Sequence, residues 1–204
     1  MHRLLSYTGR VATAVALVVT GTAALTGADA GTPIIRNDRV TVWDVPPGTA
    51  VRPSAPPQDT VIFLIRDGKA EARFEAASAV PAPIPAGTRA IVIVLDGQRL
   101  PPLPNGSGRP PAFPRAGSTK LLENDRVVVW QSEWATGVPT PLHFHDKDVV
   151  VTYLADGALA STNVAGQRVV NEYQFGLTRF NARDRVHTET LVRGAGRAIM
   201  VELK

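Results

Sequence analysis

The chain has 204 residues, of which 44% are hydrophobic and 20% are charged, and this composition is typical of a globular protein rather than a disordered one. The formal net charge is +4, but Lys and Arg stand singly among Asp and Glu, so the sequence lacks the basic stripe that nucleic-acid binding requires. Because the chain has no Cys, its stability must come from packing and not from disulfides.

The first 30 residues have the pattern of a cleaved secretory signal peptide. Arg3 and Arg10 precede an apolar run of about fifteen residues, and Ala28-Asp29-Ala30 ends it with small residues at the two positions that a signal peptidase reads. An uncleaved membrane anchor is the alternative, although the run is shorter than the roughly 20 residues that span a bilayer. We expect a mature chain that begins at Gly31, is periplasmic or secreted, and has no membrane contact after cleavage.

The rest of the chain contains an internal duplication. The stretch IIRNDRVTVWDVPPG at 34–48 returns as LLENDRVVVWQSEWATG at 121–137, and DTVIFLIRDG at 59–68 aligns without gaps on DVVVTYLADG at 148–157. Each copy consists of short β-branched and apolar runs separated by Gly, Pro, Asn and Asp, a pattern that predicts an all-β fold. We therefore expect two tandem small β-barrels.

The expected domains are a first barrel at 31–100, a linker at 101–118 and a second barrel at 119–204. The linker is rich in Pro and Gly and has no apolar run, which predicts a stiff, extended connection. Between the Gly that ends the second aligned run and the Arg that opens the last one, the first copy has 20 residues and the second has 39. The first copy is therefore expected to be a degenerate version of the second.

Three of the 4 His lie in the second copy. In a strand, His143 and His145 would point to the same face, and His187 is the remaining histidine of the expected mature chain. The first copy has Ser54 and Pro56 at the positions of the pair and lacks the segment that carries His187. This pattern predicts a metal site of three imidazoles in the second copy only. The alternative is a solvated strand end with His187 elsewhere on the surface.

The spacing Gly137-x5-His143-x-His145, followed by Gly157, resembles the first motif of the cupins, and the segment that ends at His187 occupies the place of their second motif. The resemblance covers most of the expected mature chain as a tandem, or bicupin, arrangement. It implies a jelly-roll β-barrel that holds a divalent metal on two His, usually one Glu, and a His from the second motif.

The sequence departs from the cupin pattern at two places. Val150 stands where the resemblance places the glutamate, and Ala182-Arg183-Asp184 replaces the Pro-x-Gly of the second motif. We expect a three-histidine site, as in those cupins that lack the glutamate. Asp148 is expected either as a fourth ligand or as a partner that orients one of the histidines.

Three imidazoles without a thiolate favour Fe, Zn, Mn, Cu or Ni, and they leave coordination positions for water, dioxygen or a substrate carboxylate. Glu189, two residues after His187, is a candidate base or a partner of that ring, and Tyr153 is a candidate catalytic or substrate-contacting residue. Arg179 and Gln174 are further candidates for substrate contact. The alternative for each is a packing or surface role.

Three functions are compatible with this pattern. The first is an exported metal-dependent enzyme, either a dioxygenase or another oxidoreductase, that acts on a small organic molecule. The second is a non-catalytic binder of a metal or small ligand, and a cupin isomerase is a further alternative. The third is a structural barrel with a vestigial histidine cluster. The expected partner is a small-molecule ligand or substrate, and the sequence leaves open whether the chain forms a homodimer.

Overall fold

The computed structural model describes residues 32–47, 58–79 and 82–204. The expected signal peptide, and the positions of the first copy that align with the histidine pair, lie outside these ranges. Every regular element in the described residues is a β-strand, which confirms the all-β fold class. In these same ranges no helix is long and apolar enough to cross a membrane.

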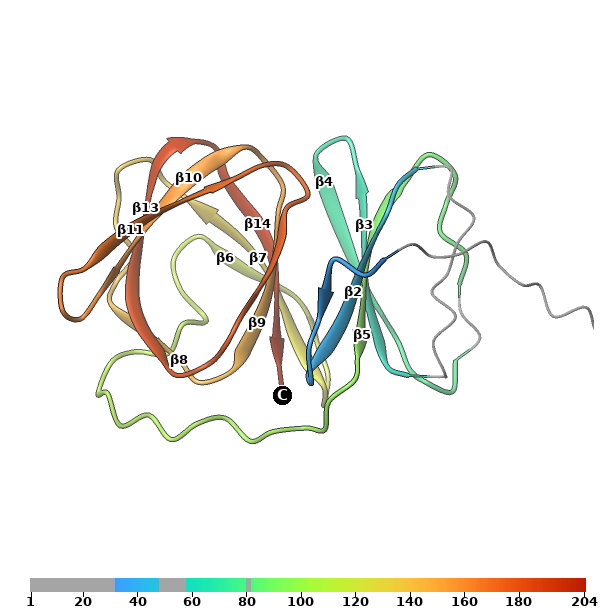
Figure 1. The fold of residues 1–204 in the computed structure, drawn as a ribbon, viewed down its shortest axis with the longest axis horizontal. Helices are drawn as coiled ribbons and strands as arrows, with labels where there is room; N and C mark the ends of the chain where they lie inside the picture. The colour runs from blue at the N-terminus through green and yellow to red at the C-terminus, as the bar shows by residue number, and fades with distance from the viewer. Residues whose placement is uncertain (1–31, 48–57, 80–81) are drawn as a thin grey trace, which may run out of the picture.

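The first repeat contributes one antiparallel sheet in the order β1-β2-β5-β3-β4. Its strands are β1 (Ile35–Arg36), β2 (Val40–Val45), β3 (Thr60–Arg66), β4 (Lys69–Glu75) and β5 (Arg89–Leu95). We call it the cover sheet, because it lies against the outside of the second repeat (Figure 1).

The second repeat forms a two-sheet β-barrel. Its strands are β6 (Ser118–Glu123), β7 (Val127–Trp134), β8 (His143–His145), β9 (Asp148–Tyr153), β10 (Gly157–Asn163), β11 (Arg168–Tyr173), β12 (Thr178–Asn181), β13 (Arg185–Gly194) and β14 (Gly196–Leu203). The five-stranded middle sheet has the order β12-β9-β14-β7-β6, and the four-stranded site sheet has the order β11-β10-β13-β8. All pairings between these strands are antiparallel.

The cover sheet repeats the strand order of the middle sheet. The strands β1, β2, β5 and β3 take the places of β6, β7, β14 and β9, and β4 occupies the edge position that β12 has in the second repeat. The described residues of the first repeat have no counterpart of the site sheet, so they form a single sheet and not the expected closed barrel. The reason is length, since the 20-residue segment of the first copy supplies only one strand where the 39-residue segment of the second supplies four.

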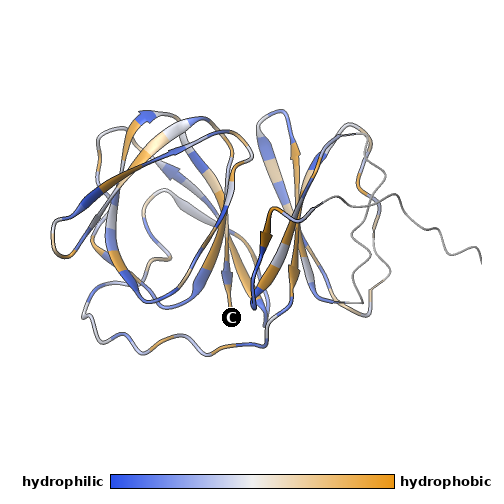
Figure 2. Cartoon of the chain, viewed as in Figure 1, coloured by the Kyte–Doolittle hydropathy of each residue, from blue (hydrophilic) through white to orange (hydrophobic). Residues whose placement is uncertain are grey.

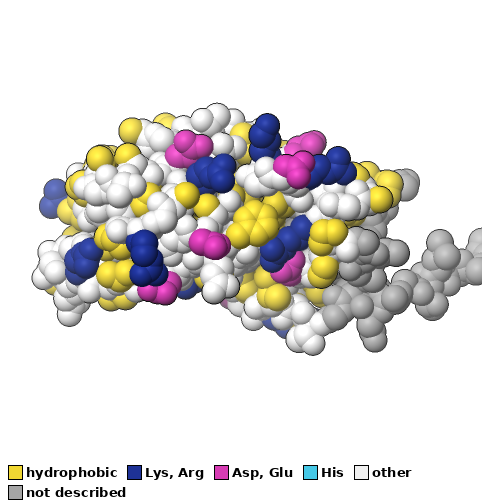
Figure 3. Space-filling view, turned by 90° about the horizontal axis from the view of Figure 1, so that it is seen from above, with side chains coloured by type: hydrophobic (Ala, Val, Ile, Leu, Met, Phe, Trp, Pro, Cys, Tyr) yellow, Lys and Arg dark blue, Asp and Glu magenta, His cyan; other side chains and the backbone are white. Residues whose placement is uncertain are grey.

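Alternation along the strands of the middle sheet assigns their side chains to two cores, one on each face of that sheet. On β14, Val201 faces the cover sheet, where it joins Phe63 and Ile91 in one apolar layer, whereas Met200 faces the barrel interior. The molecule is therefore a stack of three sheets, with apolar strands where the cover and middle sheets meet (Figures 1 and 2). On the face drawn in Figure 3, acidic and basic side chains of the described residues are interspersed, in agreement with the charge pattern of the sequence.

Residues 110–115, which belong to the expected linker, pack against the barrel. Phe144 of β8 donates its N–H to Pro110 O at 2.9 Å, and Ala112 donates its N–H to Phe144 O at 2.8 Å. The ring of Phe113 stacks on Trp130 in the barrel interior, with ring centroids 5.2 Å apart. This end of the linker therefore extends the site sheet beside β8.

Candidate metal centre

The three histidines come together on the inner face of the site sheet. In the antiparallel pairing of β8 with β13, His187 of β13 lies directly opposite His143 of β8. His145 lies two residues after His143 on β8. All three side chains are buried, with 1%, 5% and 7% exposure for His143, His145 and His187. The interpretation of the pair as a solvated strand end is therefore wrong.

The ring nitrogens converge on one point. His145 Nε2 is 3.1 Å from His143 Nε2 and 3.0 Å from His187 Nε2, and the three potential ligand atoms all lie within 4.8 Å of one another. Ligands about 2.1 Å from a metal are about 3 Å apart when they meet at roughly a right angle, so both measured separations suit adjacent ligands on one face of an ion.

The remaining ring nitrogens show why a cation fits this cluster. His143 Nδ1 lies 2.8 Å from the carbonyl oxygen of Pro141, which can only accept, so this nitrogen carries the proton and Nε2 presents a lone pair. His187 Nδ1 lies 2.8 Å from Ser161 Oγ, and His145 Nδ1 is buried without a partner. One N–H at His145 Nε2 could serve only one neighbour at a time, whereas a cation accepts lone pairs from all three rings.

Burial keeps these imidazoles neutral at physiological pH. It is the main cause that lowers the pKa of each ring, and it brings the pKa of His187 to about 4. The positive charge of Arg115 lowers the pKa of His143 further, and that of Arg185 lowers the pKa of His145 further. A neutral imidazole is the form that binds a metal, so the ligands are ready without loss of a proton.

Glu189 lies on the same inward face of β13 as His187, two residues along. Its Oε2 accepts hydrogen bonds from Arg115 Nη2 at 2.8 Å and from Trp134 Nε1 at 3.2 Å. Burial alone would raise the pKa of Glu189, but Arg115 and the neighbouring histidines outweigh burial, so the pKa is lowered and the carboxylate is charged at neutral pH. Glu189 is not the hydrogen-bond partner of the His187 ring, whose Nδ1 lies beside Ser161 Oγ, and its role as a base stays a prediction.

Arg115 is the site residue that the sequence did not reveal, because it lies in the segment read as a linker. Its Nη1 is 3.0 Å from His143 Nε2, and its guanidinium carbon is 4.9 Å from the ring centroid of Phe113 and 5.7 Å from that of Trp134. One signal was available, since Phe113 and Arg115 interrupt an otherwise Pro- and Gly-rich stretch with a large apolar and a charged side chain.

Tyr153 reaches the barrel interior from β9 of the middle sheet. Its ring stacks on Tyr173, with centroids 4.0 Å apart and an interplanar angle of 7°. Burial and the negative charge of Glu189 raise the pKa of Tyr153 to about 12, so the phenol keeps its proton at neutral pH. It can therefore donate a hydrogen bond inside the barrel but cannot act there as a base.

Asp148 is not in the cluster, which corrects the expectation that it ligates the metal or orients a histidine. Its Oδ2 lies 3.1 Å from Arg39 Nε of the cover sheet, and its Oδ1 accepts the backbone N–H of Arg183 at 2.9 Å. Strand alternation is the reason, since Asp148 and Val150 face the cover sheet, whereas Val149 faces the barrel interior. The position of Val150 therefore points away from the histidines.

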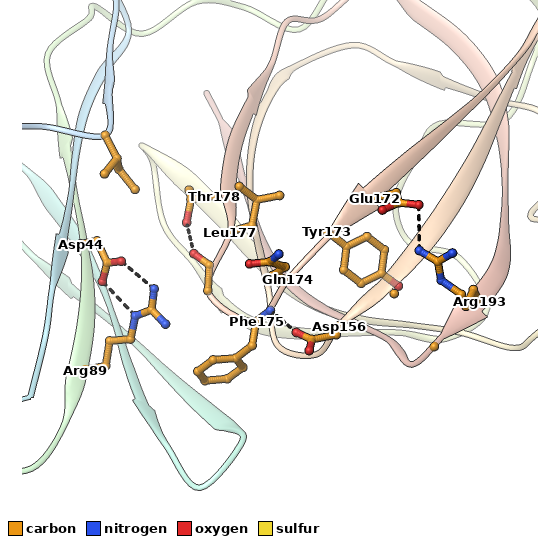
Figure 4. A pocket seen from close by; sticks show the side chains of 14 residues that line it. Asp44, Arg89, Asp156, Glu172, Tyr173, Gln174, Phe175, Leu177, Thr178 and Arg193 are labelled. Atoms are coloured by element: carbon orange, nitrogen blue, oxygen red, sulfur yellow. Dashed lines mark hydrogen bonds and ion pairs between the residues drawn. The ribbon is translucent and has the colours of Figure 1, made fainter.

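Gln174 and Arg179 lie outside the cluster as well. Gln174 borders a cavity of about 870 Å³ between the two repeats, where the ion pair of Arg89 with Asp44 faces Phe175 (Figure 4). Arg179 donates to the backbone oxygen of Glu172 at 2.8 Å. This cavity borders the start of β10, whereas His187 pairs with the end of that strand, so the cavity and the histidines lie at opposite ends of the barrel.

No family model matches the sequence, and no curated protein matches it either. Several solved structures are similar to the chain. A cupin domain from Bordetella pertussis Tohama I is 24% identical, with a TM-score of 0.39, over 48% of this chain and 99% of that one. A cupin 2 conserved barrel domain protein from Leptotrichia buccalis is 11% identical, with a TM-score of 0.46, over 88% of this chain and 92% of that one.

A third structure is an RmlC-like cupin family protein with a double-stranded β-helix fold from Methanocaldococcus jannaschii. It is 12% identical, with a TM-score of 0.37, over 52% of this chain and 90% of that one. At these identities no residue role passes from those proteins to this one. Each of these three structures is described as a cupin protein.

Proposed function

We propose that the second repeat binds one divalent metal ion through His143, His145 and His187. The observation that carries this proposal is the convergence of three buried, neutral imidazoles, with Nε2 separations of 3.1 and 3.0 Å. Fe, Zn, Mn, Cu and Ni all accept imidazole ligands, and the donor set does not choose among them. When bound, such an ion supplies Lewis-acid or redox chemistry at the coordination positions that three ligands leave free.

On this basis the favoured activity is that of an exported oxidoreductase of the dioxygenase type that acts on a small organic molecule. The histidines face a barrel interior lined by the aromatic rings of Phe113, Trp130 and Trp134, and such walls exclude water from a reacting substrate. Inside the barrel, the charged carboxylate of Glu189 can accept a proton or a hydrogen bond, and the protonated phenol of Tyr153 can donate one.

A non-catalytic binder of a metal or small ligand is the second candidate, and one observation favours it. The site is closed, since the histidines are at most 7% exposed and the side chain of Arg115 is only 8% exposed beside them. A closed site suits retention of a metal better than rapid exchange of substrate and product. A cupin-type isomerase would use the same ligands without redox chemistry.

Elemental analysis of the protein purified from its native compartment tests the metal proposal. We expect one metal ion per chain, and the variant His145→Gln should lose it, whereas the exposed control Gln167→Ala should keep it. A wild-type protein that binds no divalent metal would overturn the proposal. The same sample tests export, since mass spectrometry should find Gly31 at the N-terminus, and an intact Met1 would contradict it.

Oxygen uptake in the presence of small organic acids then separates the candidate functions. Redox-active iron or copper with substrate-dependent uptake would support the dioxygenase. Stoichiometric zinc without oxygen uptake would shift the assignment to a binder or an isomerase.

A further inference from the structure

Arg115 is held rigidly with one edge of its guanidinium toward the histidines. Its Nη2 donates to Glu189 at 2.8 Å, and its side chain is 8% exposed beneath the rings of Phe113 and Trp134. Its Nη1 points to His143 Nε2 at 3.0 Å. A buried ion pair with aromatic contacts on its faces leaves the guanidinium little freedom to turn away.

Metal binding would remove the acceptor that Nη1 now has. Because Pro141 O fixes the proton of His143 on Nδ1, the lone pair at Nε2 can serve either Arg115 or a metal ion, but not both. At neutral pH, Arg115 Nη1 therefore loses this acceptor whenever His143 binds the metal. A buried N–H of a charged group that loses its partner is costly unless another acceptor replaces it.

The charges around the cluster favour an anionic ligand once a metal is bound. Arg115 and Glu189 compensate each other, and the three imidazoles are neutral, so a divalent ion adds two uncompensated positive charges in a buried place. Arg185 adds to the excess, because it lies directly opposite His145 in the pairing of β8 with β13. Tyr153 offers no negative charge, because its pKa is raised to about 12.

We propose that Arg115 recognises the anionic group of the ligand, and that this group is a small carboxylate. One carboxylate oxygen would occupy a coordination position beside the histidines, and the other would accept the N–H of Arg115 Nη1. A small carboxylate suits this arrangement, because Nη2 is bound to Glu189 and Nη1 is the guanidinium nitrogen that points to the histidines, so one oxygen can face the metal while the other accepts a hydrogen bond from Nη1. This inference rests on the proposed metal site and names the substrate class for it.

The test uses purified protein loaded with Co(II), whose visible absorption reports the ligands of the ion, and acetate as the probe. Acetate should shift the spectrum of the wild-type protein with saturation, and neutral acetamide at the same concentrations should not. In Arg115→Gln, Co(II) should still bind with one ion per chain, but acetate should bind about 10- to 100-fold more weakly, the size expected for loss of a hydrogen bond to a charged group. Arg109→Gln, an exposed change in the same segment, should behave as wild type.

The outcomes separate this inference from the metal proposal. If the wild-type protein does not take up Co(II), both fall. If Co(II) binds but acetate leaves the spectrum unchanged, or if Arg115→Gln binds acetate as tightly as wild type, the carboxylate assignment alone is wrong. Should Arg115→Gln fail to fold because Glu189 loses its partner, Arg115→Lys keeps the charge and changes the geometry. In that variant we expect intact Co(II) binding and weakened acetate binding, and unweakened binding would overturn the role of the guanidinium.

Discussion

Acidification should destabilise the metal-free protein, because its three clustered histidines resist protonation. Burial lowers the pKa of His143, His145 and His187 below the ordinary value of 6.5. Below pH 6.5 the unfolded chain therefore binds protons that the folded chain does not, and stability falls as the pH falls. The stability is fully present above pH 6.5, and for His187 it is lost across the window from pH 6.5 down to about 4.

The size of the effect follows from His187 alone. The ordinary pKa of its imidazole is 6.5, and burial in the folded protein lowers this pKa to about 4. Each pKa unit corresponds to about 1.4 kcal/mol, so the loss from this ring is about 2 kcal/mol at pH 5 and about 3 kcal/mol at pH 4. Because a domain of this kind has roughly 5–15 kcal/mol of stability, the loss is easily measured. His143 and His145 add to it in the same direction.

Urea unfolding of chelator-treated protein at pH 7, 6 and 5 measures this loss. The range ends at pH 5 because most carboxylates titrate below it, and Glu202, whose pKa is raised by burial, would oppose the loss. The variant His187→Gln should show a shallower fall than wild type. A free energy of unfolding that changes by less than about 0.5 kcal/mol from pH 7 to pH 5, or an unchanged slope in His187→Gln, would refute the argument that the rings are buried and neutral.

Three further outcomes are expected. His187→Ala should release most of the metal in elemental analysis, and full occupancy would show that His187 is not a ligand. Asp148→Asn should keep the metal but lower the free energy of unfolding by about 3 kcal/mol, because it leaves the charge of Arg39 buried and unpaired; metal loss at unchanged stability would contradict this. Trp130→Phe should cost about 1–3 kcal/mol in thermal unfolding, because Glu202 loses the indole N–H that it accepts at 2.8 Å, and an unchanged melting temperature would contradict this.

The sequence predicted those features that depend on local spacing. The two-residue separation of His143 and His145 placed both rings on one face, and the structure agrees. The Asn-Asp-Arg stretch that occurs in both copies is typical of a turn before a strand, and Asn124 Oδ1 accepts the backbone N–H groups of Arg126 at 2.8 Å and Val127 at 2.9 Å. Such features need only the alternation of a strand or the reach of one side chain.

Features that depend on which face of a strand is inside were not predictable. All six residues of β9 are buried, because this strand lies between two cores, so its sequence shows no polar-apolar alternation. Without that alternation, nothing in the sequence says that Asp148 and Val150 face the cover sheet. The position of Arg115 depends on how a Pro-rich segment returns to β8, and periodicity carries no information on such a long-range contact.

The three-sheet stack explains why the first repeat keeps its apolar strands although its described residues lack a site sheet. The outer face of the middle sheet presents Val129, Val150 and Ile199, all of them fully buried by the cover sheet. An exposed apolar surface of that size would favour association with other molecules. To bury this surface, the cover sheet needs only strands whose alternation and twist match those of the middle sheet. Both properties are retained although the described residues of the first repeat lack the strands that would hold ligands. One repeat therefore supplies burial and the other supplies the histidines, so the chain carries a single site in the part that the structure describes.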